Sequence, residues 1–152
     1  MIVRPYRSDD EAACLAAFDG NSPYFFADWE RGDFAAFLRA GPSEPYFVVE
    51  DGGRVVACGG VFARSGGRTA GLSWGMVERS RQRRGYGRAL LRARLDWLRE
   101  HLPGLEAVTI ETSQRSEPFF ARMGFEVTRV EPDHWAPGLD RVDMRLALGP
   151  TG

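Results

Sequence analysis

Lysine is absent from the 152-residue sequence, so all twenty basic residues are arginines. The chain therefore carries no side-chain amine. The bias also lowers the weight of any single arginine cluster as a sign of a binding site. Acidic residues number twenty-one, which leaves a formal net charge of −1 at pH 7. A chain this close to neutral has no overall field that would draw it to nucleic acid or to an anionic membrane.

Long apolar runs and metal-ligand patterns are also missing. No segment approaches the ~20 apolar residues of a membrane-spanning helix, and the N-terminus turns polar too early for a signal peptide. We therefore expect a cytoplasmic protein with no membrane partner. His101 and His134 lack metal-ligand spacing, so we expect no metal. Cys14 and Cys58 are interpreted as buried thiols, with a disulfide as the alternative.

The composition is that of an ordinary folded domain. Hydrophobic residues make up 43% of the chain and charged residues 27%, as is typical of soluble globular proteins. A chain of 152 residues suits one domain with one core. No repeat or low-complexity segment divides it, so we predict a single domain over residues 1–152.

Turn residues and hydrophobic periodicity predict the element order β-α-α-β-β-β-α-β-α-β-β. A capping box, Ser8 with Glu11, is expected to open the first helix, which ends at Gly20–Asn21. Gly75 lies inside a predicted strand, which often marks a bulge. The other helices are predicted at 33–39, 86–101 and 117–123, and the strands at 2–5, 45–50, 54–63, 68–77, 105–112, 125–130 and 141–148.

The stretch from Leu72 to Leu91 carries the strongest functional signal. An apolar run leads through an arginine-rich turn to Gly85-Tyr86-Gly87 and then into a helix. Unpaired N–H groups in a first helical turn, together with the helix dipole, attract negative charge. Glycines without a Cβ let a phosphate approach the backbone. The sequence therefore predicts an anion site at this turn. The helix that follows has a core-facing stripe of Leu91, Leu95, Leu98 and Leu102.

Residues Gln82 to Gly87 read Q-x-x-G-x-G, five residues after a strand that ends at Val77. This pattern resembles the coenzyme A pyrophosphate loop of the GNAT superfamily of acyl-CoA-dependent N-acyltransferases, and it differs from the Rossmann and P-loop patterns. A second stretch, PFFARMGF at 118–125, is similar to the family segment in which a short helix returns to a strand. The element order also matches, so the resemblance covers residues 2–148.

The resemblance implies an α/β (α+β) GNAT fold, with a central, mixed, mostly antiparallel sheet of six to seven strands flanked by about four helices. It implies an N-acetyltransferase that moves an acetyl (acyl) group from acetyl-CoA to an amine acceptor by direct attack. The acceptor would be a small molecule or a peptide. Neither its identity nor the acyl chain length follows from the residues. Family members often form homodimers, which leaves that state open here.

The resemblance also implies where the cofactor lies. Backbone N–H groups of the glycine loop would hold the pyrophosphate, and arginine side chains would add charge. The preceding strand would pair with the pantetheine arm where it splays from its neighbour. The expected cofactor-binding residues are Met76 and Val77 on the strand, Gln82, Arg83, Arg84, Gly85, Tyr86, Gly87 and Arg88 in the loop, and Ser113 and Phe120 farther along the chain.

Acetyl transfer needs a neutral amine, and neutralising one of pKa ~10.4 at pH 7 costs about 4–5 kcal/mol. A carboxylate that accepts the proton, directly or through water, is worth roughly 10²–10⁴ in rate. Glu111 is the first candidate base, because it shares a strand face with Ser113, a family position that lines the cofactor. Glu78 is the second. For each, a surface carboxylate at a strand end is the structural alternative.

The step that releases the thiolate departs from the family pattern. Many members carry a tyrosine general acid at the position of Phe120, and phenylalanine has no proton to donate. A thiol of ordinary pKa near ~8.5 leaves without full protonation, so catalysis is not excluded. His134, Tyr46 and water are alternative acids, and the sequence does not choose among them.

The acceptor pocket of this fold is roofed by the segment between the first two helices and by the last hairpin. Aromatic rings there, with nearby carboxylates, would suit a cationic or aromatic acceptor, although such rings equally fill cores. The turn-rich flank 131–138 is interpreted as a candidate lid. The expected substrate-binding residues are Tyr24, Phe25, Phe26 and Trp29, with His134 and Trp135 facing them.

Two other functions fit parts of the sequence. Phe120 favours a catalytically silent GNAT-fold protein that binds acyl-CoA without transferring the acyl group. The arginines between 79 and 88 would suit a nucleic-acid binder, which needs a basic patch with stacking rings. Tyr86 is the single ring there, and both the net charge and the arginine bias argue against this function. We therefore expect no nucleic-acid partner.

Overall fold

The computed structural model describes residues 1–149. Its strands are β1 (Ile2–Pro5), β2 (Tyr46–Asp51), β3 (Arg54–Ala63), β4 (Thr69–Val77), β5 (Ala107–Thr112), β6 (Glu126–Ala136) and β7 (Leu139–Ala147). Its α-helices are α1 (Glu11–Asn21), α2 (Glu30–Arg39), α3 (Tyr86–His101) and α4 (Glu117–Arg122), with 3-10 turns at Ser8–Asp10 and Arg79–Arg81. The predicted mixed sheet with four helices is confirmed within these residues.

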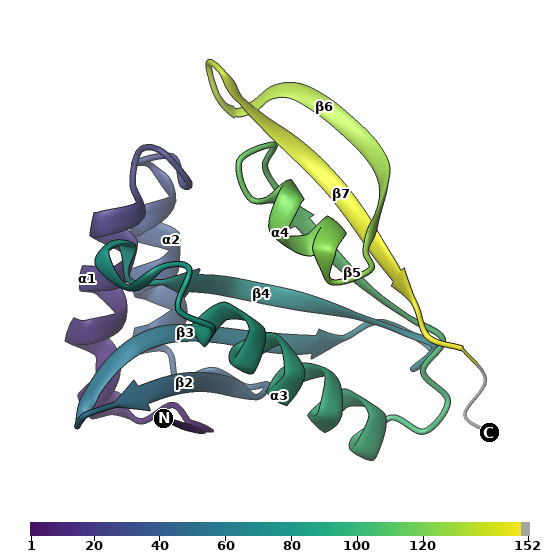
Figure 1. The fold of residues 1–152 in the computed structure, drawn as a ribbon, viewed down its shortest axis with the longest axis horizontal. Helices are drawn as coiled ribbons and strands as arrows, with labels where there is room; N and C mark the ends of the chain where they lie inside the picture. The colour runs from purple at the N-terminus through teal and green to yellow at the C-terminus, as the bar shows by residue number, and fades with distance from the viewer. Residues whose placement is uncertain (150–152) are drawn as a thin grey trace.

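One seven-stranded sheet in the order β1-β2-β3-β4-β5-β7-β6 organises the chain (Figure 1). Neighbouring strands are antiparallel except β4 and β5, which run parallel. That parallel contact ends where Gly71 pairs with Thr109. Beyond it β4 runs on to Val77 and β5 to Thr112 without pairing with each other, and Figure 1 shows the two strands diverging. The sheet is therefore split into two halves by a gap between β4 and β5.

The helices cover opposite faces of the sheet. On one face α1 and α2 pack through Phe18 and Phe34 onto strand residues such as Val48. On the other face α3 and α4 pack through residues such as Leu91 and Phe120. The gap between β4 and β5 is thus flanked by α1 and α2 on one side of the sheet and by α3 and α4 on the other.

A bulge in β4 lies beside this gap. Cys58 pairs with Met76 and Gly60 with Ser73, so Trp74 and Gly75 together stand opposite Gly59. Trp74 has φ of 42°, a left-handed conformation that bulky residues rarely adopt. The Tyr46 hydroxyl braces the bulge by donating to the Trp74 carbonyl oxygen at 2.7 Å. The bulge expected at Gly75 is confirmed.

The structure corrects three local predictions. The Ser8 capping box is wrong, because the Asp10 carboxylate accepts from the Arg7 N–H at 2.8 Å and from both Arg4 Nη atoms. The second helix begins at Glu30 rather than at 33. The candidate lid at 131–138 is mostly strand, because β6 continues to Ala136 by pairing with β7. Pro132 is tolerated there because β6 is the edge strand of the sheet.

Candidate active site

The glycine loop ends in an open helix N-terminus. Gly85 has φ of 89°, and a Cβ built on it meets nothing within 4 Å. The first bond of α3 runs from the Ala89 N–H to the Gly85 carbonyl oxygen at 3.0 Å. The N–H groups of Tyr86, Gly87 and Arg88 therefore have no helical acceptor, and no other acceptor reaches them within residues 1–149. The loop presents the unpaired donors that a phosphate group needs.

Two further residues of the loop, Gln82 and Tyr86, are held by hydrogen bonds to other parts of the protein. Gln82 Nε2 donates to Asn21 Oδ1 at 2.8 Å, and Asn21 Nδ2 donates to the Val77 carbonyl oxygen at 2.8 Å. The buried Tyr86 ring points inward, and its hydroxyl donates to the Asp51 carboxylate, which lowers the pKa of Asp51. Gln82 therefore braces the loop, and Tyr86 offers only its N–H. The one ring that a nucleic-acid interface would have used lies inside the protein.

Gly87 has a packing role that the sequence did not reveal. A Cβ at this position would lie 3.3 Å from Phe119 Cε1 and 3.6 Å from Val77 Cγ2. Its missing side chain therefore lets α3 approach α4, in addition to the room for a phosphate that the sequence predicts. Three exposed arginines surround the loop, and no ion pair within the described chain includes them: Arg83, Arg84 and Arg88.

Three of the other residues expected near the cofactor border the gap beyond Gly71, and the fourth, Phe120, lies in the core. Met76 and Val77 lie on the part of β4 that has lost β5 as a partner. Ser113 is buried just past the end of β5, where its Oγ accepts from the Arg115 N–H at 3.2 Å. The Phe120 ring packs edge-on against Phe119 and Phe125, with centroids 5.1 and 5.4 Å away. Phe120 thus belongs to the core under α4.

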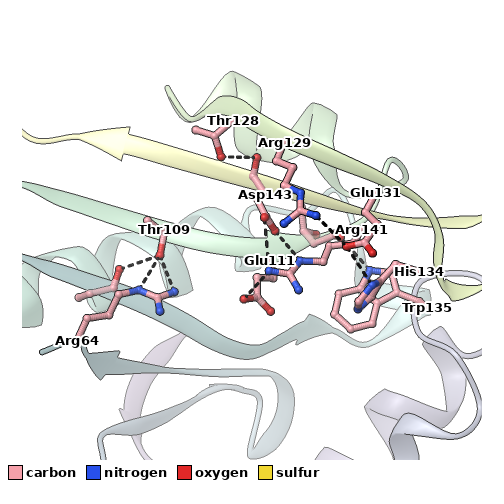
Figure 2. A network of polar contacts seen from close by, with 12 residues as sticks. Arg64, Thr109, Glu111, Thr128, Arg129, Glu131, His134, Trp135, Arg141 and Asp143 are labelled. Atoms are coloured by element: carbon pink, nitrogen blue, oxygen red, sulfur yellow. Dashed lines mark hydrogen bonds and ion pairs between the residues drawn. The ribbon is translucent and has the colours of Figure 1, made fainter.

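Glu111 lies on the opposite face from α3, because its neighbours Val108 and Ile110 pack with that helix and strand side chains alternate. Its side chain is 48% exposed, and its Oε1 accepts from Arg141 Nη2 at 3.0 Å (Figure 2). The hydrogen bond to Asp143 and the charge of Glu111 raise the pKa of Arg141. An exposed carboxylate beside the gap, held by one guanidinium, can still accept a proton from an incoming amine.

Glu78, the second candidate base, lies elsewhere. It follows β4, and its carboxylate accepts from the Arg54 guanidinium of β3 and from the Ser80 hydroxyl. These contacts hold it toward β3, on the other side of β4 from the gap. Both residues thus lie at strands that border the gap, Glu111 on β5 and Glu78 just past β4, but the Glu78 carboxylate is held toward β3.

The aromatic segment between α1 and α2 spans the mouth of the gap. Trp29 Nε1 donates to the Trp135 carbonyl oxygen at 2.7 Å, and Trp135 Nε1 donates to the Thr112 carbonyl oxygen at 3.0 Å. The guanidinium of Arg115 lies 4.3 Å from the Tyr24 ring centroid, while Arg79 lies 4.9 Å from that of Phe25. The structure thus brings the predicted roof and hairpin together.

Phe26, the fourth aromatic residue predicted to bind substrate, is turned inward. Its ring packs with Phe18, at 5.1 Å between centroids, and with Trp74, at 6.4 Å. It therefore reaches the gap only through Trp74.

The sequence reasoning missed Arg94, which is buried in the middle of α3. A signal existed, because position 94 lies between Leu91 and Leu98 on the core-facing stripe. The facing strands also carry Gly59 and Gly75, and a Cβ on either would approach its guanidinium within 3.0 Å. An arginine on an apolar stripe opposite glycines indicates a buried charge with a place made for it.

The fold and the site together define an α/β protein whose sheet opens between β4 and β5 and whose helix α3 presents unpaired N–H groups suited to an anionic ligand. The sequence matches the family model of the acetyltransferase (GNAT) family over residues 14–125. That match covers most of the chain, so the chain belongs to this family. The family transfers an acetyl group from acetyl-CoA to an amine. The resemblance drawn from the two motifs is confirmed.

Solved structures of GNAT proteins share the fold. One is yncA from Salmonella typhimurium with its cofactor acetyl-CoA, with a TM-score of 0.76, 23% identity, and coverage of 100% of this chain and 96% of that chain. Another is the ribosomal-protein-S18-alanine N-acetyltransferase from Escherichia coli, with a TM-score of 0.79, 18% identity, and coverage of 99% and 96%. A third is an aminoglycoside 6'-N-acetyltransferase complexed with coenzyme A, with a TM-score of 0.75, 14% identity, and coverage of 100% of this chain and 99% of that chain. No curated protein matches the sequence.

None of the helices formed by residues 1–149 has the length and apolar character needed to cross a membrane. Within the same residues, no group of three or more His, Cys, Asp or Glu side chains is placed to hold a metal ion.

Proposed function

We propose that this chain is an active N-acetyltransferase in which the cofactor enters from the α3 and α4 face and the amine from the α1 and α2 face. The observation that carries the proposal is the position of the unpaired N–H groups of Tyr86, Gly87 and Arg88 at the end of the gap between β4 and β5. An anion loop and an unpaired strand edge at one gap fit a long ligand with a charged end.

The described residues fit the parts of coenzyme A in order. The open space at Gly85 and the loop donors suit the pyrophosphate, and exposed guanidinium groups beside them suit its negative charge. The edge of β4 from 72 to 77 offers backbone donors and acceptors to the amides of the pantetheine arm. Ser113 and Phe120 then lie toward the reacting end of the gap. When bound, acetyl-CoA supplies an acetyl group on a thioester.

Glu111 is proposed as the base for the acceptor. Its carboxylate lies two residues beyond the last β4–β5 pair and faces the α1 and α2 side. There it attracts a cationic amine and accepts its proton, directly or through a water molecule. Arg141 holds Oε1, and no hydrogen bond within the described chain engages Oε2. The second oxygen is therefore available to the amine.

The acceptor is proposed to be a small-molecule or peptide amine with an aromatic or cationic part. Tyr24, Phe25 and Trp29 are partly or fully exposed and stand with Trp135 at the α1 and α2 side of the gap. Rings in this position contact an apolar or cationic group through stacking and cation–π attraction. The proposed site is built from one copy of the chain.

One experiment tests the cofactor site with a matched pair of arginines on α3. Arg88→Gln removes a guanidinium in the first turn, whereas Arg99→Gln removes an equally exposed one in the last turn. We expect Arg88→Gln to weaken coenzyme A binding about 10- to 150-fold, because a hydrogen bond to a charged group contributes roughly 1.5–3 kcal/mol. Arg99→Gln should bind as the wild type does. Pantetheine, which lacks the pyrophosphate, should not distinguish the two variants.

Calorimetry measures these affinities, and release of the coenzyme A thiol measures transfer to a panel of amines. If both substitutions weaken coenzyme A binding equally, or if neither weakens it, the pyrophosphate does not bind at the loop. Binding without thiol release from any amine would favour the rival function that Phe120 suggests, a silent acyl-CoA binder.

A further inference from the structure

Arg94 is a buried arginine at the centre of the fold. It lies in the middle of α3 and is 3% exposed, in a row with Leu90, Leu91 and Leu98. Its Nε donates to the Gly60 carbonyl oxygen at 3.1 Å, and its Nη2 donates to the Ser73 carbonyl oxygen at 3.4 Å. Both acceptors are neutral. The guanidinium is therefore hydrogen bonded without being neutralised.

No ion pair within residues 1–149 includes Arg94. The titratable groups that act on it are Tyr46 and Cys58, and no carboxylate acts with them. Burial lowers the pKa of Arg94 to about 10, so the side chain remains cationic at neutral pH. A buried charge without a counter-ion costs several kcal/mol, and an apolar side chain would fill the same space at no such cost.

Two glycines make the place for this charge. A Cβ on Gly59 would lie 2.9 Å from Arg94 Cζ, and a Cβ on Gly75 would lie 3.0 Å from Nη2 and 3.1 Å from Nη1. The contact at Gly59 is closer than real Cβ atoms show and the contacts at Gly75 are tighter than most, so a side chain at either position would press on the guanidinium. The guanidinium thus lies flat against the backbone of the β4 bulge.

The third nitrogen of Arg94 has no hydrogen-bond partner among residues 1–149. This nitrogen, Nη1, lies beside Gly75, because a Cβ on that residue would be 3.1 Å from it. Gly75 is exposed on the stretch of β4 that β5 has left. Unused N–H groups of Arg94 therefore lie next to the bulge, where β4 borders the gap.

We propose that Arg94 stabilises the negative charge on the departing coenzyme A sulfur, in a chain that has Phe120 where a tyrosine could have donated a proton. The inference rests on the proposed placement of the pantetheine arm along β4. The acceptor nitrogen forms its bond to the carbonyl carbon, the carbon–sulfur bond breaks, and the electron pair stays on sulfur. The amine proton goes to Glu111. Arg94 gives up no proton and acts by its fixed charge.

The test is the pKa of the coenzyme A thiol in the complex, which needs no turnover. A cation within roughly 4–6 Å lowers the pKa of an acid by about 1–3 units, so the bound thiol should titrate about one unit or more below free coenzyme A. Ultraviolet absorbance of the thiolate reports this titration. A complex with desulfo-coenzyme A serves as the blank, because the protein itself carries two free thiols, Cys14 and Cys58.

Three variants separate the charge from the structure. Arg94→Met keeps the length and removes the charge, and it should fold because replacing a buried charge by an apolar side chain is often neutral or stabilising. It should bind coenzyme A and return the thiol pKa to that of free coenzyme A. Arg94→Lys should retain part of the lowering. Arg92→Met, at an exposed position two residues earlier, should leave the thiol pKa as in the wild type.

The wild-type titration decides the question even if Arg94→Met does not fold. Binding of coenzyme A with an unshifted thiol pKa overturns the role of Arg94 and leaves the proposed function standing. An equal shift in wild type and Arg94→Met also overturns it. Failure of the wild type to bind coenzyme A overturns the proposed function itself.

Discussion

Replacing Glu111 by glutamine tests the proposed base with little change of structure. Glutamine keeps the shape of the side chain and one acceptor oxygen but removes the charge and the basicity. The ion pair that is lost joins a half-exposed carboxylate to Arg141, whose side chain is 25% exposed. Pairs of this kind contribute about 0–1 kcal/mol to stability. Arg141 also retains its bond to Asp143 at 2.8 Å. The free energy of unfolding should therefore fall by no more than about 1 kcal/mol.

The expected effect on rate is much larger. A positioned general base contributes roughly 10²–10⁴-fold, which corresponds to about 2.7–5.4 kcal/mol in the barrier at ~1.36 kcal/mol for each tenfold change. We expect Glu111→Gln to lower kcat by about 10²-fold or more and to leave coenzyme A affinity little changed. The acid limb of the pH–rate profile should flatten. The expected change in the barrier is several times larger than the expected change in the free energy of unfolding, so a loss of stability alone does not account for the loss of rate.

Steady-state kinetics with acetyl-CoA and the best amine of the panel give kcat, and chemical denaturation gives the stability. Asp143→Asn is the matched control, because it removes the other carboxylate that contacts Arg141 and leaves Glu111 in place. A kcat within about threefold of wild type for Glu111→Gln, with the acid limb intact, would refute the reasoning and make Glu78 the next residue to test. An equal loss in Asp143→Asn would assign the effect to the Arg141 network instead.

Two further predictions concern the core. Phe120→Tyr adds a hydroxyl that costs about 1–3 kcal/mol if it stays unpaired in the core. If the ring edge borders the thioester instead, coenzyme A should restore that stability in a thermal-shift assay and kcat should rise, and absence of both would show that Phe120 only fills the core. Asp10→Asn should destabilise the fold by about 2–4 kcal/mol because it breaks the buried pair with Arg4. The hydrogen bond from Arg4 holds the pKa of Asp10 below its ordinary 3.8, so this stability is present above that pH and is lost as pH falls below it. A wild-type unfolding curve whose acid dependence equals that of Asp10→Asn would contradict this assignment.

Local patterns alone determined several elements to the residue. The predicted strand 54–63 and the predicted helix 86–101 have the bounds of β3 and α3. Their signals are short in range: a diglycine turn before the strand, a leucine stripe, and Pro103 after the helix. The GNAT resemblance likewise came from residues adjacent in sequence, and it predicted the sheet and the order of the elements that the structure has.

Boundaries failed for two kinds of reason. The start of α2 has a local signal that the prediction missed, because the Glu30 carboxylate accepts from the Ala27 N–H three residues earlier at 2.9 Å. The other two depend on another strand. Arg4 of β1 draws Asp10 away from the simple capping box, and β6 gains its last residues because β7 lies beside it. Spacing along the chain does not specify these two partners.

The sequence by itself determined that an anion loop follows a bulged strand, because glycine spacing and hydrophobic period are local properties of the backbone. Only the tertiary structure decided what the side chains do there. Gln82 braces against Asn21 and Tyr86 turns toward Asp51, both across long stretches of chain. The guanidinium of Arg94 has room solely because the register at the bulge sets Gly59 and Gly75 together beneath it. Sequence period predicts which face of a helix is buried, but strand register determines what that face meets.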